Sequence, residues 1–338
     1  METSIVGPDE FTRICESLNK QSLYQSVSWQ KIICESFNAS SIFVVTKNSD
    51  RQVILATPFT WKRKGIFKFI GAPLPGTHTE FVGTLFANNL SISNQLAAFR
   101  SQHDLLIKSG FDYIEWAFQE TPSVKFNTEL TRIGYASDRK NSIEVNLEGD
   151  IDEIWDNLTG RARNMIRKAK KLEVSVDRLQ PSLDLISQFY EILSHRFKQQ
   201  GQETRHPKEF YELICSSLFQ IGRLDFLVAK HKGSNVAFGI FLNFQSRTVF
   251  LSGCSTHCGN TVAAPSLIQW RAIQLSKERS DAKFDFGGTG QPAIDKFKRS
   301  FGGTDCFVQR WVYRSVPIKV LLPVTMKLAN IFGYTIRV

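Results

Sequence analysis

Residues 284–303 read FDFGGTGQPAIDKFKRSFGG, and the rest of the chain is organised around this stretch. Its short apolar run ends at a glycine pair, which predicts a strand followed by a loop. In such a strand Asp285 points to the face opposite the two phenylalanines that flank it. A basic segment and a second glycine pair follow. A carboxylate, a glycine loop and lysines so close together could form a site for an anionic substrate, and they are also compatible with a strand and a solvated basic turn.

The composition is that of a globular protein large enough for two domains. The chain has 338 residues, of which 42% are hydrophobic and 22% are charged, so two domains can each bury a core. The formal charge of +10 favours anionic partners. Six cysteines are scattered without the spacing of a disulfide framework or a zinc site, so we expect reduced thiols, a cytoplasmic location and no metal. We expect no signal peptide and no transmembrane helix.

The apolar pattern predicts two α/β halves that share one order of elements. In each half helices are followed by a strand hairpin, a third strand, a loop, a helix and a short strand with an acidic residue. The predicted helices cover residues 9–38, 91–109 and 186–198 and begin again at Pro207 and Pro265. The predicted strands cover residues 42–46, 53–59, 66–70, 113–118, 143–147, 224–230, 236–244, 248–252, 283–286 and 307–314.

Two pairs of segments support a diverged duplication. Residues 113–116 correspond to 284–286 and residues 130–135 correspond to 298–303, with an offset of about 170 residues in both cases. We therefore predict mixed α/β sheets in two tandem domains. Their predicted bounds are 1–148 and 149–315, followed by a tail at 316–338.

Residues 151–172, between the two halves, are predicted to form a basic helix. Apolar residues recur every three or four positions and share one face. The remaining arc carries Arg161, Arg163, Arg167, Lys168, Lys170 and Lys171. Arginine can bind phosphate through two hydrogen bonds, so something anionic could approach this face; a solvated basic face is the alternative. Gly160 either splits the helix or allows a ligand close to the backbone.

A second candidate site lies in residues 251–260, LSGCSTHCGN, before the helix that begins near Pro265. A strand, a loop of small residues and a helix N-terminus can cradle a pyrophosphate through backbone N–H groups. Gly253, Gly259 and Asn260 are the candidate cofactor-binding residues. A Walker loop and the Gly-x-Gly-x-x-Gly pattern are both missing, which argues against a dinucleotide fold.

Several motifs of the second half occur together in one known family. They are Trp155-x-x-Leu158 with Arg163-x-x-x-Arg167-Lys168-Ala169, Ala264-Pro265 through Trp270, Phe284-Asp285-Phe286-Gly287, and Phe297-Lys298 before Phe301-Gly302. With these motifs the chain resembles the FemAB-like proteins of the GNAT acyltransferase superfamily, which are built from two tandem GNAT-type domains. The resemblance covers residues 143–314 and extends more loosely to the first half through Gln25-Ser26 and Trp29.

The resemblance implies an acyl- or aminoacyltransferase. Family members move aminoacyl groups from tRNA to peptidoglycan precursors, or acyl groups from coenzyme A to amines of envelope or exported molecules. It implies that Lys298 stabilises negative charge that develops on the acyl carbonyl. Asp285 is the best carboxylate candidate for a second catalytic residue, with a structural role as the alternative. Arg163, Arg167 and Trp29 are the implied substrate-binding residues.

The resemblance also gives expectations about ligands and partners. We expect no bound cofactor, and acyl-CoA or aminoacyl-tRNA as the donor substrate, although residues 258–263 (CGNTVA) depart from the usual GNAT cofactor loop. The expected acceptor is an anionic small molecule or a lipid-linked precursor of the cell envelope. Peripheral contact with the inner face of the membrane could come from the amphipathic tail, and nucleic acid is expected only with a tRNA donor. The alternative function is a non-catalytic basic adaptor that binds RNA or an anionic membrane through residues 161–171.

Overall fold

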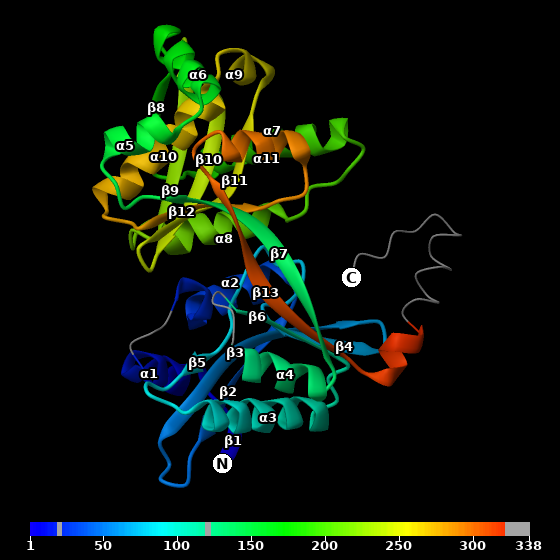
Figure 1. Cartoon of the computed structure of the whole chain (residues 1–338). Coiled ribbons are helices and arrows are strands. Elements are labelled where there is room, and N and C mark those ends of the chain that lie inside the picture. Colours follow the sequence, from blue (N-terminus) through cyan, green and yellow to red (C-terminus); the bar gives the residue numbers. More distant parts are fainter. Residues whose placement is uncertain (19–21, 119–122, 322–338) are drawn as a thin grey trace. The chain divides into compact units, whose positions relative to one another are not determined.

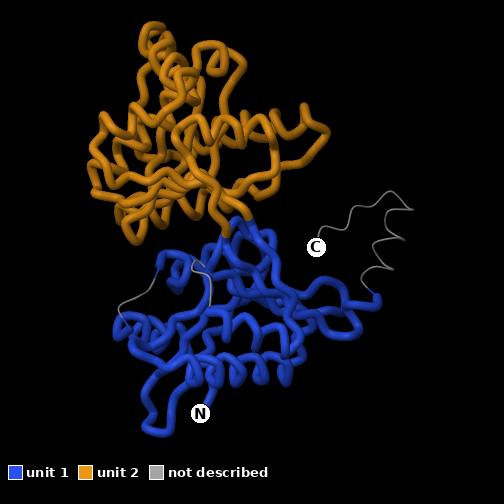
Figure 2. Tube along the Cα trace, viewed as in Figure 1, with its two compact units in different colours: residues 1–140, 308–338 blue, residues 141–307 orange. Residues whose placement is uncertain are grey.

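The structure is a computed structural model that describes residues 1–18, 22–118 and 123–321. It divides into two compact units (Figure 2). Unit 1 comprises residues 1–140 and 308–338, and unit 2 comprises residues 141–307. The chain passes from unit 1 to unit 2 within strand β7 (Tyr135–Asn146) and returns within β13 (Thr304–Arg314). Each unit contains a mixed sheet with helices on both faces (Figure 1).

In unit 1 the strand order is β1-β2-β3-β4-β6-β13. The strands are β1 (Glu2–Val6), β2 (Ser40–Lys47), β3 (Val53–Lys64), β4 (Phe67–Ala72), the short β5 (Leu85–Phe86) beside β3, and β6 (Tyr113–Phe118). Neighbouring strands are antiparallel except β4 and β6, which run parallel. The helices are α1 (Pro8–Leu18), the 3₁₀ helix η1 (Leu23–Gln25), α2 (Val27–Phe37), α3 (Ile92–Lys108) and α4 (Val124–Arg132).

The two faces of the unit 1 sheet are covered by different helices. On one face Phe11 of α1 packs against Phe43 of β2, with ring centroids 4.7 Å apart. On the other face Phe99 of α3 packs against Trp116 of β6 at 4.4 Å. Because successive strand residues point to opposite faces, the fully buried pattern of β6 requires cover on both sides.

In unit 2 the strand order is β7-β12-β11-β10-β9-β8. The strands are β8 (Ser175–Arg178), β9 (Leu224–His231), β10 (Ser234–Phe244), β11 (Arg247–Ser255) and β12 (Lys283–Gly288). Here β11 and β12 are the parallel pair, and their other neighbours are antiparallel. The helices are α5 (Ile151–Asn157), α6 (Gly160–Lys171), α7 (Leu183–Gln199), α8 (Lys208–Leu218), α9 (His257–Thr261), α10 (Ala264–Glu278) and α11 (Pro292–Arg299).

The unit 2 sheet is likewise covered on both faces. Leu227 of β9 belongs to the apolar cluster that includes α6 and α10. Its neighbour Phe226 points the other way and contacts Phe189 of α7, with ring centroids 6.4 Å apart. Helices α6 and α10 therefore cover one face, and α7 covers the other.

The two halves repeat one series of elements, as predicted. The series β1-α1-α2-β2-β3-β4-α3-β6-α4-β7 corresponds to β8-α7-α8-β9-β10-β11-α10-β12-α11-β13. The last strand of each series pairs with a strand of the other series. Strand β13 pairs with β6, and β7 pairs with β12. The compact units therefore do not coincide with the sequence repeats, and the predicted bounds of the repeats remain a prediction.

The predicted fold class is confirmed, with local corrections. The basic segment is two helices rather than one, because the chain leaves α5 at Leu158 and Thr159 caps α6 by accepting from Ala162 N–H. The loop of small residues predicted before the helix near Pro265 is mostly regular structure, because β11 continues to Ser255 and the short helix α9 follows. The pattern also missed β1, β5, β8, α4 and α11, which are short or lack a regular apolar stripe.

The described part of the C-terminal tail packs in unit 1. A short helix covers residues 316–321, and the fully buried Ile318 joins Phe69, Leu74, Tyr113 and Val312 in one cluster. The remainder of the predicted amphipathic tail lies outside the described residues. No helix in the described ranges is long and apolar enough to span a bilayer.

Candidate active site

Strands β11 and β12 stop pairing part-way along their length. Their parallel register ends at Val249 and Asp285, although β11 continues to Ser255 and β12 to Gly288. On its other side β11 carries a β-bulge, because Phe250 pairs with Phe241 and Ser252 with Ile240. A bulge bends its strand and increases the local twist. We call the two strand ends that do not pair with each other, residues 250–255 and 286–288, the β11–β12 fork.

The connection from β11 to α10 folds onto β10, away from β12. Thr256 N–H donates to Val236 O at 2.9 Å. A Cβ on Gly259 would lie 2.2 Å from the same carbonyl oxygen. The Gly259 N–H itself donates to Thr256 Oγ1 at 3.0 Å, and Asn260 Oδ1 accepts from Ser255 Oγ at 2.7 Å. These hydrogen bonds fix the short helix α9 at the side of the fork.

Gly253 lies in β11 and has a packing role. A Cβ there would be 2.9 Å from Phe250 Cζ and 3.0 Å from Phe238 O. Glycine therefore lets the Phe250 ring lie against the strand. Three predicted cofactor-binding residues, Gly253, Gly259 and Asn260, are thus close together along the chain, and the contacts seen for them are internal ones.

Asp285 is buried at the last position of β12 that pairs with β11, and both of its carboxylate oxygens are hydrogen-bonded. Oδ1 accepts from Ser142 Oγ at 2.7 Å and from Gly287 N–H at 2.8 Å, and Oδ2 accepts from Arg247 Nη1 at 3.1 Å. Burial raises the pKa of Asp285 above its ordinary value, against the opposing effects of these three donors. The flanking phenylalanines belong to the apolar cluster under α10, so the predicted orientation of this strand is confirmed.

Arg247 at the start of β11 lies between two carboxylates. Its Nη1 contacts both Asp285 Oδ2 and Glu144 Oε1, and Lys283 Nζ is 3.2 Å from Glu144 Oε2. Burial alone would raise the pKa of Glu144, but the charges and hydrogen bonds of Arg247 and Lys283 hold that pKa below its ordinary value. Strands β7, β11 and β12 are thus joined by ionic contacts where β11 and β12 separate.

Lys298 lies on α11 and is only 6% exposed. Its Nζ donates to Gly287 O at 3.0 Å and to Gly288 O at 2.5 Å. Burying an ammonium group is costly unless acceptors replace water, and the two carbonyls at the end of β12 supply them. The basic segment, for which a solvated turn was one of two interpretations, is therefore a helix that directs one lysine toward the fork end of β12. Lys296 on the same helix is exposed.

The basic helix α6 begins beside the end of α11. Thr159 N–H donates to Ser300 O at 2.9 Å. Arg163 Nη1 donates to Asp156 O at 3.1 Å, and the guanidinium of Arg167 lies 5.5 Å from the Trp155 ring centroid. The other four basic residues of this helix are exposed: Arg161, Lys168, Lys170 and Lys171.

Trp29, the remaining predicted substrate-binding residue, is fully buried in unit 1. Its Nε1 donates to Thr79 Oγ1 at 3.0 Å, and its ring lies 4.8 Å from that of Tyr24. Gly160 opens α6, and a Cβ there would meet nothing within 4 Å, so packing does not require glycine at that position.

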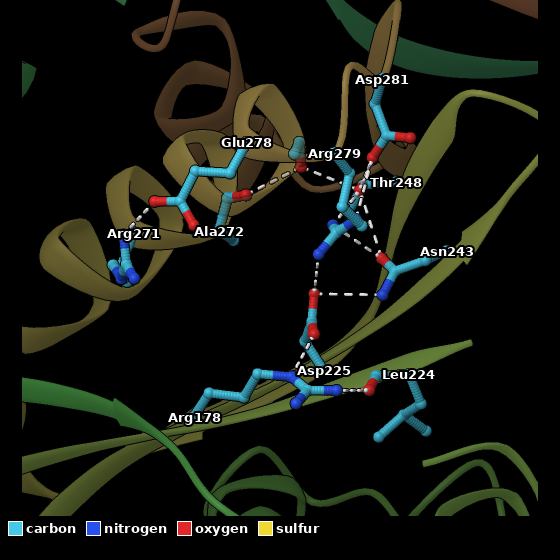
Figure 3. Close-up of polar contacts among 11 residues, drawn as sticks. Arg178, Leu224, Asp225, Asn243, Thr248, Arg271, Ala272, Glu278, Arg279 and Asp281 are labelled. Carbon is cyan, nitrogen blue, oxygen red and sulfur yellow. Dashed lines mark hydrogen bonds and ion pairs between the residues drawn. The ribbon is translucent and has the colours of Figure 1, made fainter. Parts of the chain in front are cut away.

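A second polar network lies at the opposite, paired end of β11 (Figure 3). Asp225 Oδ1 accepts from Arg178 Nε at 2.6 Å, and its Oδ2 accepts from Arg279 Nη1 at 2.8 Å and from Asn243 Nδ2 at 3.1 Å. Arg279 also donates to Thr248 Oγ1 at 2.8 Å. The network links β8, β9, β10 and β11 to the end of α10, so we assign it a structural role.

Three residues at the fork have no local signal in the sequence. Ser142, Glu144 and Arg247 reach Asp285 or its neighbours across 38 to 143 positions of sequence. They lie close together because β7, the last strand of the first series, pairs with β12 of the second series, and because β11 and β12 pair in parallel. No single segment of sequence encodes these pairings.

Comparison with known proteins agrees with this fold. Residues 158–299 match the family model described as an acetyltransferase (GNAT) domain. The crystal structure of FemX is similar over 95% of this chain and 99% of its own, with 13% identity and a TM-score of 0.72. A tandem GNAT protein from the clavulanic acid biosynthesis pathway is similar over 93% and 98%, with 10% identity and a TM-score of 0.57. No curated protein sequence matches the chain.

A third similar structure is L-PGS from Bacillus licheniformis, with 12% identity, a TM-score of 0.54, and coverage of 95% of this chain and 96% of that one. At these identities the structures demonstrate the fold, and the family model identifies the type of domain. The predicted tandem fold and the predicted enzyme class are confirmed, and the non-catalytic adaptor is set aside. Residues 158–299 therefore form a GNAT-type acetyltransferase domain, and the whole chain shares its fold with FemX and with the tandem GNAT protein.

Proposed function

We propose that the enzyme transfers an acyl group from a coenzyme A thioester to an amine of a cell-envelope precursor, and that the reaction takes place at the β11–β12 fork. The observation that carries this proposal is the early end of the β11–β12 register, directly before the Lys298 contacts. An extended ligand with amide groups can hydrogen-bond to a strand end along a side where that strand has no partner. The amide-containing arm of coenzyme A is such a ligand.

The proposed reaction is a direct attack of the acceptor amine on the thioester carbonyl. A C–N bond forms, the carbonyl oxygen becomes negatively charged, and collapse of the tetrahedral intermediate breaks the C–S bond. The amine loses one proton and the departing thiolate gains one, so that free coenzyme A is released as the thiol. Lys298 supplies positive charge for the oxyanion, in a buried setting where an ionic contact is stronger than in water.

The acceptor side of the proposal rests on charge. Arg161, Lys168, Lys170 and Lys171 are exposed on α6, and α6 begins next to the end of the helix that carries Lys298. We infer an anionic or lipid-linked acceptor, handled at the inner face of the membrane. An aminoacyl-tRNA donor would use the same carbonyl chemistry, and nucleic-acid binding is proposed only for that donor.

Acetyl-CoA binding and turnover test the proposal. At about 100 times its dissociation constant, acetyl-CoA should stabilise the folded protein by ~2.7 kcal/mol, seen as a higher melting temperature. Release of free thiol in the presence of amine acceptors should then depend on Lys298 and be retained in the exposed control Lys296→Ala. If neither acetyl-CoA nor longer acyl-CoAs bind, while charged tRNA does, the coenzyme A donor is replaced by aminoacyl-tRNA.

A further inference from the structure

We propose that Asp285 is a positioning residue that orients Lys298 through the backbone of Gly287 and Gly288, and that it does not exchange protons with substrate. The catalytic use of Lys298 rests on the proposed function, whereas its positioning by Asp285 can be tested in the free protein.

The contacts form a continuous path from one side chain to the other. Asp285 Oδ1 accepts from Gly287 N–H at 2.8 Å, two residues further along the chain. This is the hydrogen bond of an Asx turn, in which an aspartate side chain ends regular structure and redirects the backbone. The carbonyls of Gly287 and Gly288 then both accept from Lys298 Nζ, at 3.0 and 2.5 Å.

The turn needs both a glycine and a fixed carboxylate. Gly287 has φ of +73°, a left-handed conformation that costs glycine little. Ser142 Oγ and Arg247 Nη1 hold the carboxylate from the two strands on either side of β12, at 2.7 and 3.1 Å. A side chain that is 2% exposed and held from three directions is suited to fixing geometry and poorly placed to accept a proton from an external amine.

The equivalent position in unit 1 shows what the turn adds. Glu115 is also buried on its strand, but its carboxylate accepts from Arg310 and from Tyr113 OH. Within the described part of unit 1, Glu115 makes no comparable hydrogen bond to the backbone that follows it. Glu115 therefore provides a matched control for removal of a buried strand carboxylate.

The test measures how readily the Lys298 amine reacts with a trace of acetic anhydride in the intact protein, read by peptide mass spectrometry. Lys277 is the internal reference, because its Nζ also donates to a backbone carbonyl of unit 2, Leu147 O at 2.7 Å. In Asp285→Ala, labelling of Lys298 relative to Lys277 should rise roughly tenfold, since a hydrogen bond to a charged group is worth about that factor. Glu115→Ala should leave the ratio unchanged.

Each outcome decides the proposal. A folded Asp285→Ala protein with an unchanged ratio, or one in which Lys277 and Lys298 rise together, overturns positioning. If Asp285→Ala does not fold, Ser142→Ala removes one support only, and a ratio at the wild-type value then counts against the proposal. Asp285→Asn, which retains an oxygen acceptor for the turn, should lie closer to wild type than Asp285→Ala.

Turnover with an acyl-CoA separates positioning from proton transfer. A positioning role predicts that Asp285→Asn keeps the acidic limb of the pH–rate profile and lowers kcat with little change in KM. Loss of that limb in Asp285→Asn would instead identify Asp285 as a general base and overturn the proposal. Absence of turnover with all acyl-CoAs would count against the proposed donor, while the labelling result would still decide the positioning.

Discussion

The parallel strand pairs of the two units end in different ways. In unit 1 the long connection that follows β4 returns between the strands: Val82 N–H donates to Ala117 O of β6 at 3.3 Å, and Gly83 N–H donates to Ala72 O of β4 at 3.2 Å. Gln25 Nε2 holds Val82 O at 2.8 Å, and the segment is buried. In unit 2 the corresponding connection folds onto β10 instead. The same strand pair is therefore closed by the chain's own backbone in one unit and forms a fork in the other.

The side chains at corresponding positions of the two repeats also differ. The alignment of the repeats places Leu130 of α4 at the position of Lys298 of α11, and Leu130 is a fully buried core residue. Glu115 takes the position of Asp285. One repeat thus closes its strand pair with backbone and has a leucine at this helix position, whereas the other directs an ammonium group to the end of β12. This difference concentrates the proposed chemistry in unit 2.

The largest expected effect is on the stability of unit 1. Arg310 binds Glu115 through Nε and Nη2 at 2.9 and 2.8 Å, so Arg310→Ala leaves a buried carboxylate without its main partner. This should lower the free energy of unfolding by about 3–5 kcal/mol, measured by urea denaturation. Acyl transfer per folded molecule should stay at the wild-type rate, and a specific loss of kcat would show that unit 1 takes part in the chemistry.

The next effect concerns the lysine itself. Lys298→Leu converts the position to the residue found in the unit 1 repeat, and it should lower kcat by about 10²–10³-fold while the protein stays folded, because one oxyanion-stabilising group contributes roughly that much. Thiol release from acyl-CoA measures it, with Lys296→Ala as the control. A wild-type rate in Lys298→Leu would remove Lys298 from the mechanism.

A smaller effect is expected from the segment that closes the unit 1 strand pair. Gly83 has φ of +60°, so Gly83→Ala should cost about 1–2 kcal/mol of unfolding free energy, measured by thermal or urea denaturation. Gly160→Ala is the control, because a Cβ there meets nothing within 4 Å. Equal stability of the two variants would contradict the conclusion that Val82 and Gly83 hold the ends of β4 and β6 together in unit 1.

The smallest effect is a pH dependence in unit 2. The pKa of Glu144 is held below its ordinary value in the folded protein, so its charge adds stability above the ordinary glutamate pKa, and that stability is lost as the pH falls through the lowered value. Glu144→Gln should therefore be less stable than wild type by about 1 kcal/mol at pH 7, and the difference should shrink under acid. Urea denaturation of both proteins at several pH values tests this. A stability difference that grows on acidification would mean that the pKa of Glu144 is raised in the folded protein and not lowered.

The sequence predicted the parts of this comparison that depend on local pattern. The strand before Gly287, the helix near Pro265 and the repeat order all follow from periodicity and punctuation by glycine and proline. Other features depend on pairing between distant segments. They are the pairing of β7 and β13 with strands of the other series, the hydrogen bonds of Val82 and Gly83 to β6 and β4, and the contacts of Arg247. Such pairing leaves no mark on the periodicity of a single segment, and this is why the role of Lys298 could be inferred only through a resemblance.

Hydrogen exchange of backbone amides in the intact chain, with and without saturating acetyl-CoA, tests the central claim most directly. The account predicts added protection in residues 250–255 and at the start of α10, with no change in residues 69–72, 81–83 and 113–118. Protection confined to the unit 1 segments, or saturated binding that leaves residues 250–255 unchanged, would contradict it.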